Sequence, residues 1–194
     1  MPNKRHQHYK FNKPYDMLCQ FSSNNSKEQR KKTFLPRLDI FPNELMPVGR
    51  LDEKSEGLVL LTTDGKLSDF INRSGIEKEY YAQLDGDINL EAINTLKTGV
   101  SIGLKGKKYI TKPCIVSKIN TPLLEKANSK IRLGRHRPNS WISITLTEGK
   151  FRQIRKMTAA VGFPTLRLVR VRVDKITLKD LAEKEAVELQ HLII

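Results

Sequence analysis

The sequence predicts an α+β fold with a mixed, mainly antiparallel central sheet and helices packed on it. Segments with the period-two alternation of strands outnumber segments with a helical apolar stripe. The strand-like segments do not alternate with long helices, as a doubly wound parallel sheet would require. With 194 residues, 38% of them hydrophobic and 29% charged, the chain can also bury a core. We therefore expect a single domain over residues 1–194.

The N-terminal third shows two strands separated by irregular chain. Residues 8–13 alternate and stop at Pro14, which has no backbone N–H to donate. Residues 22–33 are polar and basic without apolar periodicity, so we expect a flexible basic surface loop. The apolar run 57–63 predicts a buried strand that ends in the turn Asp64–Gly65.

The middle third alternates short helices with strands. Helical spacing predicts helices over 66–72 and 87–97, and strand patterns lie at 79–84 and 109–119. Pro113 places the last of these strands at an edge or a bulge. The apolar faces expected are Leu67, Phe70 and Ile71 in the first helix and Leu90, Ile93 and Leu96 in the second.

The C-terminal third begins with a second basic segment. Residues 120–139 lack periodicity and predict a long flexible loop, which in a compact domain is often functional. Strands are expected over 140–147 and 166–173, a helix over 151–161, and a last strand or helix near 186–194. The apolar face expected for this helix is Phe151, Ile154, Met157 and Val161.

The positive charge is large and unevenly distributed. The formal net charge is +14 at pH 7. Residues 118–140 hold six Lys or Arg against one acid, and residues 150–175 hold eight against one. Such concentration points to a polyanionic partner, with nucleic acid first and an anionic membrane second. The membrane role is the weakest reading, because no basic amphipathic helix carries an exposed bulky apolar face.

Cysteines and apolar segments indicate a cytoplasmic protein. Cys19 and Cys114 lie far apart without metal-ligand spacing, and we expect free reduced thiols and no zinc site. No apolar stretch approaches the length of a membrane span, and the first residues lead into no signal-peptide core.

Three features of the sequence suggest a catalytic or binding site. Asp52 precedes the apolar run, where a lone aspartate would ordinarily cap a turn. Arg152, Arg155 and Lys156 share a face at a helix N-terminus, which favours phosphate or a buried carboxylate. An arginine partner would keep Asp52 ionised and usable as a nucleophile or base. Tyr80, in a strand, fills the core or stacks on a base.

Four ordered segments resemble the pseudouridine synthases that act on ribosomal RNA. The resemblance spans nearly the whole chain, and within the family it is strongest to the E type of large-subunit enzyme. The segments are FNKPYDMLCQF (11–21), GRLDEKSEGLVLLTTDG (49–65), KEYYAQLDG (78–86) and EGKFRQIRKMTAAVGFPTLRLVR (148–170).

The resemblance implies the pseudouridine synthase fold, with two subdomains flanking a basic cleft. It implies isomerisation of a uridine to pseudouridine in ribosomal RNA, most directly 23S RNA, without cofactor or metal. Many relatives carry an N-terminal S4-type RNA-binding domain, whereas few residues precede the first strand here. RNA capture is therefore expected to rest on the basic surface of a monomeric catalytic domain.

The roles of single residues also follow from the resemblance. Asp52 matches the catalytic aspartate, and Arg155 matches its basic partner. Arg50 matches the arginine that flips the target base, Tyr80 the tyrosine that stacks on it, and Ile154 the apolar residue beside it. The RNA-binding residues expected are Arg132, Arg135, Arg137, Lys150, Arg152 and Lys156.

Two alternatives remain open at this stage. One is a catalytically silent factor that binds ribosomal RNA or assists ribosome assembly, and needs the same basic face. The other is the same chemistry on a different ribosomal or transfer RNA uridine. The residues also leave open whether Asp52 attacks C1′ or removes the proton at C2′, and whether free RNA or an assembling subunit is the substrate.

Overall fold

The computed structural model describes residues 5–36, 38, 41–131 and 137–192. The chain divides into two compact units, one holding Met1–Ile76 and Asp174–Ile194, the other Glu77–Val173. Nearly all strand pairs are antiparallel, with one short parallel pair. The predicted α+β architecture with a mixed, mainly antiparallel sheet is confirmed, whereas the predicted basic cleft between subdomains stays a prediction.

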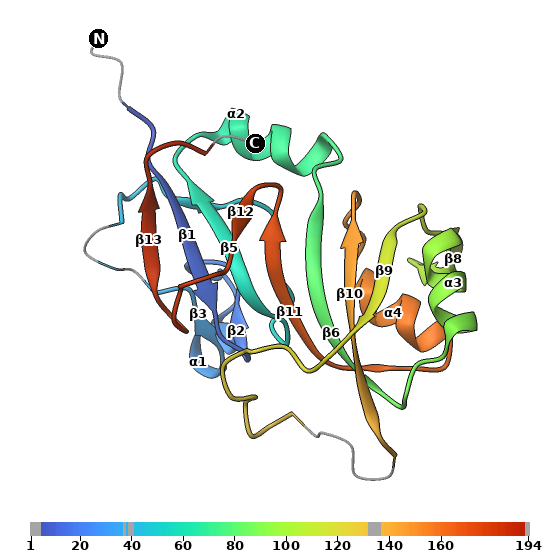
Figure 1. The fold of residues 1–194 in the computed structure, drawn as a ribbon. Coiled ribbons are helices and arrows are strands. Elements are labelled where there is room, and N and C mark those ends of the chain that lie inside the picture. The colour runs from blue at the N-terminus through green and yellow to red at the C-terminus, as the bar shows by residue number, and fades with distance from the viewer. Residues whose placement is uncertain (1–4, 37, 39–40, 132–136, 193–194) are drawn as a thin grey trace. The chain divides into compact units, whose positions relative to one another are not determined.

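In the first unit, strand β1 (His8–Lys13) lies between β13 (Ala186–Leu189) and β5 (Glu56–Thr62), antiparallel to both (Figure 1). Every residue of β5 is buried, as its apolar run predicts. Its partner β4 spans Met46–Pro47. The remaining short strands of this unit are β2 (Met17–Leu18) and β3 (Thr33–Phe34), which pair in parallel, and β12 (Ile176–Thr177).

The helices of the first unit begin at side-chain caps. In α1 (Ser26–Lys31) the Asn25 side chain accepts hydrogen bonds from Lys27 N and Glu28 N. This helix lies where an irregular loop over 22–33 is predicted, so that part of the prediction is wrong. Six residues are too few to show an apolar stripe, and none of them is buried.

The second helix, α2 (Gly65–Arg73), begins at Asp64 in the same way. Ile71 is buried, but Phe70 is 57% exposed, so Phe70 does not belong to the apolar face expected for this helix.

The second unit contains four adjacent antiparallel strands in the order β11 (Thr165–Val173), β6 (Lys78–Asp85), β10 (Asn139–Leu146) and β9 (Ile115–Ile119). Strands β7 (Ser101–Leu104) and β8 (Lys107–Ile110) form a hairpin. The single strand predicted over 109–119 is thus two strands, with the break at Pro113.

Helices α3 (Leu90–Thr98) and α4 (Gln153–Ala160) cover one face of this unit's sheet. Their buried side chains join one apolar cluster with alternate residues of β6 and β10. Gly99 ends α3 with a φ of 114°, and a Cβ there would lie 2.5 Å from the carbonyl oxygen of Thr111. Leu90, expected in the apolar face of α3, is exposed, whereas Ile88 before it and Ile93 and Leu96 after it belong to the cluster.

The start of α4 differs from the prediction. The pattern predicts a helix from 151, but α4 begins at Gln153, and Arg152 has a left-handed φ of 53°. Phe151 therefore lies outside the helix and is exposed rather than part of the apolar face. Residues 120–131 form no helix or strand, in agreement with the predicted loop, and the rest of that loop up to 136 lies outside the described residues.

Candidate active site

Asp52 lies in the turn that leads into β5. Gly49 starts this segment with a φ of 66°, and Leu51 anchors it by burying its side chain. The carbonyl oxygen of Asp52 accepts a hydrogen bond from Ser55 N at 3.0 Å, which closes a tight turn. The Asp52 side chain is half-buried. The carboxylate therefore lies in the turn just before the first residue of a fully buried strand.

A fully buried lysine at the end of β1 holds this turn. Lys13 Nζ donates to the carbonyl oxygens of Met17 at 2.7 Å, Pro14 at 2.9 Å and Glu53 at 3.3 Å. Burial lowers the pKa of Lys13 to about 8, although nearby thiol and carboxylate groups, including that of Asp52, act to raise it. Sequence reasoning missed this residue; a lysine at the end of a strand, directly before a proline, was the signal.

The flanks of the turn make further contacts within the same unit. Glu53 forms an ion pair with Lys32 at 2.7 Å, and Asp16 N donates to the Glu53 carbonyl oxygen at 2.9 Å. Arg50 is exposed, and its Nη2 donates to Gln20 Oε1 at 3.2 Å. Arg50 and Asp52 thus lie two residues apart in the same segment, and the roles expected for them stay predictions.

Three other predicted site residues lie in the second unit. Tyr80 on β6 packs against the apolar cluster to which Ile154 of α4 belongs. Ile154 is only 4% exposed, so its side chain contributes mainly to that core. Arg155 is half-buried, and its Nη1 donates to the carbonyl oxygen of Thr165 at 3.2 Å. This contact fixes the guanidinium relative to the start of β11.

Glu148, a residue that sequence reasoning missed, positions the segment that precedes α4. Glu148 accepts from Gln153 Nε2 at 2.6 Å, from Lys112 N at 2.9 Å and from the Tyr109 hydroxyl at 2.5 Å. Burial acts to raise the pKa of Glu148, but these hydrogen bonds outweigh it and hold the pKa below its usual value. Gln153 Oε1 in turn accepts from Lys150 N at 2.9 Å. The available signal was an acid five residues before a buried glutamine.

The predicted RNA-binding residues differ in their surroundings. Lys150 and Arg152 are exposed, and Lys156 is half-buried. Arg137 forms an ion pair with Asp85 at 3.0 Å, which offsets part of its charge. Arg132 and Arg135 lie outside the described residues.

Two arginines in β11 are buried. Arg167 is 6% and Arg170 is 3% exposed. Arg170 pairs in register with Tyr80 across the sheet. Arg170 follows Leu168 by two residues, so both side chains lie on the same face of the sheet.

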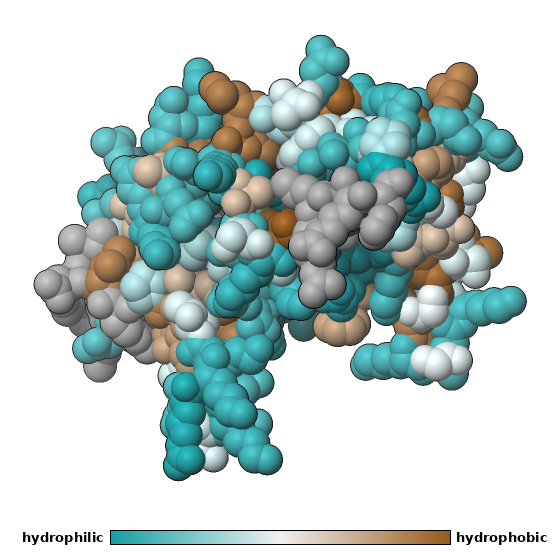
Figure 2. Space-filling view, turned by 90° about the horizontal axis from the view of Figure 1, so that it is seen from below, coloured by the Kyte–Doolittle hydropathy of each residue, from teal (hydrophilic) through white to brown (hydrophobic). Residues whose placement is uncertain are grey.

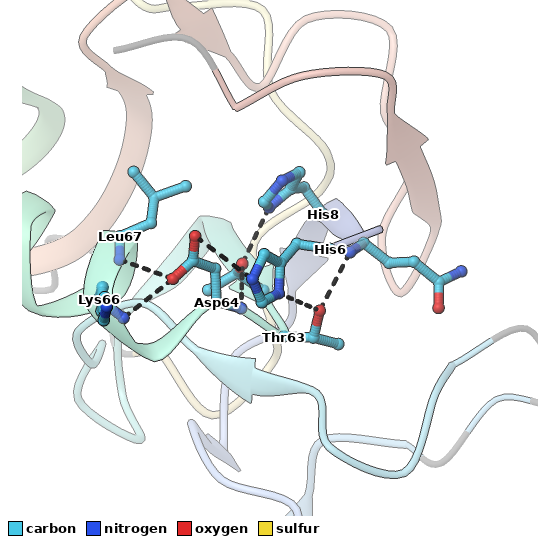
Figure 3. Close-up of polar contacts among 8 residues, drawn as sticks. His6, His8, Thr63, Asp64, Lys66 and Leu67 are labelled. Carbon is cyan, nitrogen blue, oxygen red and sulfur yellow. Dashed lines mark hydrogen bonds and ion pairs between the residues drawn. The ribbon is translucent and has the colours of Figure 1, made fainter. Parts of the chain in front are cut away.

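A separate polar cluster lies where β5 meets α2 (Figure 3). Asp64 Oδ1 accepts from Lys66 N and Leu67 N, and His6 lies 3.9 Å from the other carboxylate oxygen. His8 Nδ1 and Thr62 Oγ1 are 2.9 Å apart. Burial lowers the pKa of His8. This cluster fastens the N-terminal segment to the helix cap.

The described residues contain no cluster of metal-ligand side chains. None of their His, Cys, Asp and Glu side chains form a group of three that could hold a metal ion. Cys114 donates its thiol to the Leu96 carbonyl oxygen at 3.2 Å, and burial raises its pKa to about 11.

Among the described helices, no segment has the length and apolar character needed to cross a membrane. On the face shown in Figure 2, hydrophilic side chains cover most of the surface and hydrophobic ones occupy small separate areas.

Known proteins are similar to this chain in sequence and in fold. The chain is 38% identical over 182 residues to ribosomal large subunit pseudouridine synthase E of Vibrio parahaemolyticus, covering 93% of this chain and 72% of that protein. It is 38% identical over 174 residues to the protein of the same name in Xanthomonas axonopodis pv. citri, covering 88% of this chain and 87% of the relative. A crystal structure of a pseudouridylate synthase superposes with a TM-score of 0.71 at 26% identity, covering 95% of this chain and 70% of the other.

The family match includes the turn that carries Asp52 and the helix that carries Arg155. Residues 7–160 match the profile described as RNA pseudouridylate synthase, which is more than half of the chain. The sequence relatives and the similar crystal structure also cover most of this chain. The chain therefore belongs to the RNA pseudouridylate synthase family.

Proposed function

We propose that this chain isomerises a specific uridine to pseudouridine in the RNA of the large ribosomal subunit, 23S RNA in bacteria. The observation that carries the proposal is the half-buried Asp52 in a turn clamped by Lys13, within a sequence of this family. Relatives at 38% identity are named as large-subunit pseudouridine synthases, which supports this RNA as substrate. The net charge of +14 suits a phosphate backbone.

The reaction requires one ionised group at a sugar carbon and a closed pocket. The target base must be flipped out of its helix, at a cost of a few kcal/mol. In one route Asp52 attacks C1′ as the N1–C1′ bond breaks, the ring turns, and C5 displaces the carboxylate from C1′. In the other route Asp52 removes the C2′ proton as the N1–C1′ bond breaks, which gives a glycal, and it returns that proton to C2′ when C5 bonds to C1′. In both routes C5 then loses its proton and N1 gains one, so the product is an isomer of the substrate. Arg155 would keep Asp52 ionised, because a guanidinium favours the charged carboxylate.

The other predicted site residues would bind the RNA. Arg50 would occupy the gap left by the flipped base, and Tyr80 and Ile154 would pack on the loose ring. The exposed Lys150 and Arg152 and the half-buried Lys156 would contact phosphates, together with Arg132, Arg135 and Arg137. We also propose that the chain acts as a monomeric, cytoplasmic catalytic domain.

The test is Asp52→Asn, which keeps shape and removes the charge. We expect it to abolish pseudouridine formation, because a neutral amide is neither nucleophile nor base, while folding and RNA binding stay near wild type. Carbodiimide mapping of large-subunit RNA from a deletion strain complemented with each variant measures the product and locates the uridine.

The matched control is Asp69→Asn, the same chemical change in the same unit. Asp69 forms an exposed ion pair with Arg73 on α2, and such pairs contribute little to stability. Full modification by Asp52→Asn would refute the catalytic assignment. A wild-type protein that binds the RNA yet restores no pseudouridine would instead favour the catalytically silent RNA-binding factor.

A further inference from the structure

The ring of Phe151 is 71% exposed, although its sequence pattern places it in the core. The left-handed φ of 53° at Arg152 turns the chain just before α4 and takes Phe151 out of phase with Ile154 and Met157. A left-handed conformation is unfavourable for a residue with a side chain.

The exposed ring is held in place by a lysine. Lys156 Nζ lies 5.3 Å from the centroid of the Phe151 ring and donates a hydrogen bond to the Gly103 carbonyl oxygen at 2.7 Å. The ammonium is therefore fixed between the β7–β8 hairpin and the aromatic face. A ring braced in this way loses little conformational entropy when a ligand packs on its exposed side.

The surroundings of Phe151 are positively charged. Lys150 and Arg152 are its exposed neighbours, and no acidic residue occurs between 149 and 156. Lys150 Nζ also lies 5.1 Å from the centroid of the Tyr109 ring. The nearest acid in sequence, Glu148, is already engaged by three hydrogen bonds. The exposed Phe151 ring is thus flanked in the sequence by two positively charged residues, Lys150 and Arg152.

We propose that Phe151 is a stacking platform for an unpaired base of the RNA substrate, with the adjoining phosphates on Lys150 and Arg152. Aromatic rings in basic surroundings bind single-stranded nucleic acid, because every base has a π face and every linkage a phosphate. The inference rests on the proposed function for the identity of its ligand, and it assigns a binding role outside the residues that act on the flipped uridine.

An unpaired base is a better occupant than a base in a helix or a protein side chain. Bases inside a duplex already stack on their neighbours and cannot cover the ring without unpairing. A protein partner would contact the ring irrespective of RNA structure. The platform therefore predicts a preference for single-stranded over double-stranded RNA that depends on this one side chain.

The experiment measures binding of full-length variants to a 12-nucleotide single-stranded RNA containing 2-aminopurine, and to a 12-base-pair RNA duplex. Phe151→Ala should weaken single-strand binding by about 5- to 100-fold, the range for loss of one aromatic–base stack, with little effect on the duplex. The slope of log K against log salt should not change, because Phe151 carries no charge. Phe151→Trp should restore affinity and quench 2-aminopurine fluorescence.

Phe70→Ala is the matched control, since Phe70 is also a strongly exposed phenylalanine and lies on α2 of the other unit. Equal single-strand affinities for Phe151→Ala and Phe70→Ala, equal losses on single strand and duplex, or no wild-type binding to the single strand would each overturn the platform.

The outcomes for the platform and for the proposed function can be separated. If the wild type forms pseudouridine but Phe151→Ala behaves like Phe70→Ala in binding, the platform fails and the enzymatic function stands. If RNA binding depends on Phe151 but the wild type forms no pseudouridine, the enzymatic function fails and the platform stands.

Discussion

Lys13 shows how one buried side chain can fix a candidate catalytic segment. Its ammonium is enclosed by carbonyl oxygens from three residues, one of them next to Asp52. Burying an ammonium is costly unless such acceptors replace the lost water. The lowered pKa, about 8, shows that burial outweighs the neighbouring acids. The side chain therefore joins the end of β1 to the turn before β5.

Replacing this lysine should destabilise the protein and disturb the turn. Lys13→Met removes the donor from three carbonyl oxygens, and we expect a loss of about 2–4 kcal/mol in the free energy of unfolding. Urea denaturation followed by circular dichroism measures it. Lys10→Met removes the same charge from the same strand, where Nζ makes a single exposed contact at 3.4 Å. Equal stabilities for the two variants would show that the buried contacts contribute nothing.

Glu148 acts at the scale of secondary-structure elements. Its carboxylate joins the end of β8, through Tyr109, to the residue that begins α4, Gln153. The same carboxylate accepts from Lys112 N in the segment before β9. Four stretches of chain are thus positioned around the residues that lead to Ile154 and Arg155.

Stability should depend on the ionisation of Glu148. Its folded-state pKa is lower than the ordinary value of 4.5, so its contribution is complete above about pH 4.5 and is lost as pH falls through the folded-state pKa. Glu148→Gln cannot ionise, so its free energy of unfolding should fall less steeply between pH 5 and pH 3. Urea titrations at several pH values measure this. Glu125→Gln, at an exposed loop position, should keep the wild-type slope.

At the scale of the whole molecule, the charge distribution sets RNA affinity and its response to salt. The net charge of +14 is concentrated in 118–140 and 150–175. Each phosphate contact made by Lys or Arg releases counterions and steepens the fall of affinity with salt. Arg137 should contribute less than a full phosphate contact, because it already forms an ion pair with Asp85.

Replacing the three arginines of the basic loop should therefore reduce the salt dependence of RNA affinity by less than the loss of three phosphate contacts would. Changing Arg132, Arg135 and Arg137 together to Gln should reduce the slope of log K against log salt by about 1.4, two contacts at about 0.7 each. Filter binding to large-subunit RNA at several salt concentrations measures the slope. The control removes three exposed charges elsewhere, Lys175, Lys179 and Lys184. An unchanged slope in the loop variant would exclude the loop from the RNA contact surface.

Much of the fold and of the candidate site was predictable from local patterns. Alternation predicts β1, β6 and β10, a buried apolar run predicts β5, and caps or stops predict the ends of α2 and α3. The turn with Arg50 and Asp52 was also predictable, because the spacing of residues within one segment is written in the sequence. Strand pairing then confirmed the mainly antiparallel architecture.

Other features were not predicted, for two reasons. The cap at Asn25 and the left-handed φ of Arg152 are local, but apolar periodicity does not report them, so α1 and the exposure of Phe151 were missed. The burial of Arg170 depends instead on the pairing of β11 with β6, where Arg170 lies opposite Tyr80. That pairing joins residues far apart in the chain.

The sequence by itself determined most of the elements and the family resemblance, and it supplied the candidate site residues, because periodicity and motif spacing are local properties of the chain. Only the tertiary structure decided that Lys13 is buried beneath the Asp52 turn, that Glu148 joins β8 to the start of α4 and that Phe151 faces solvent. Hydrogen-bond partners and burial are set by which distant segments pack together, and that information appears only when the chain is folded.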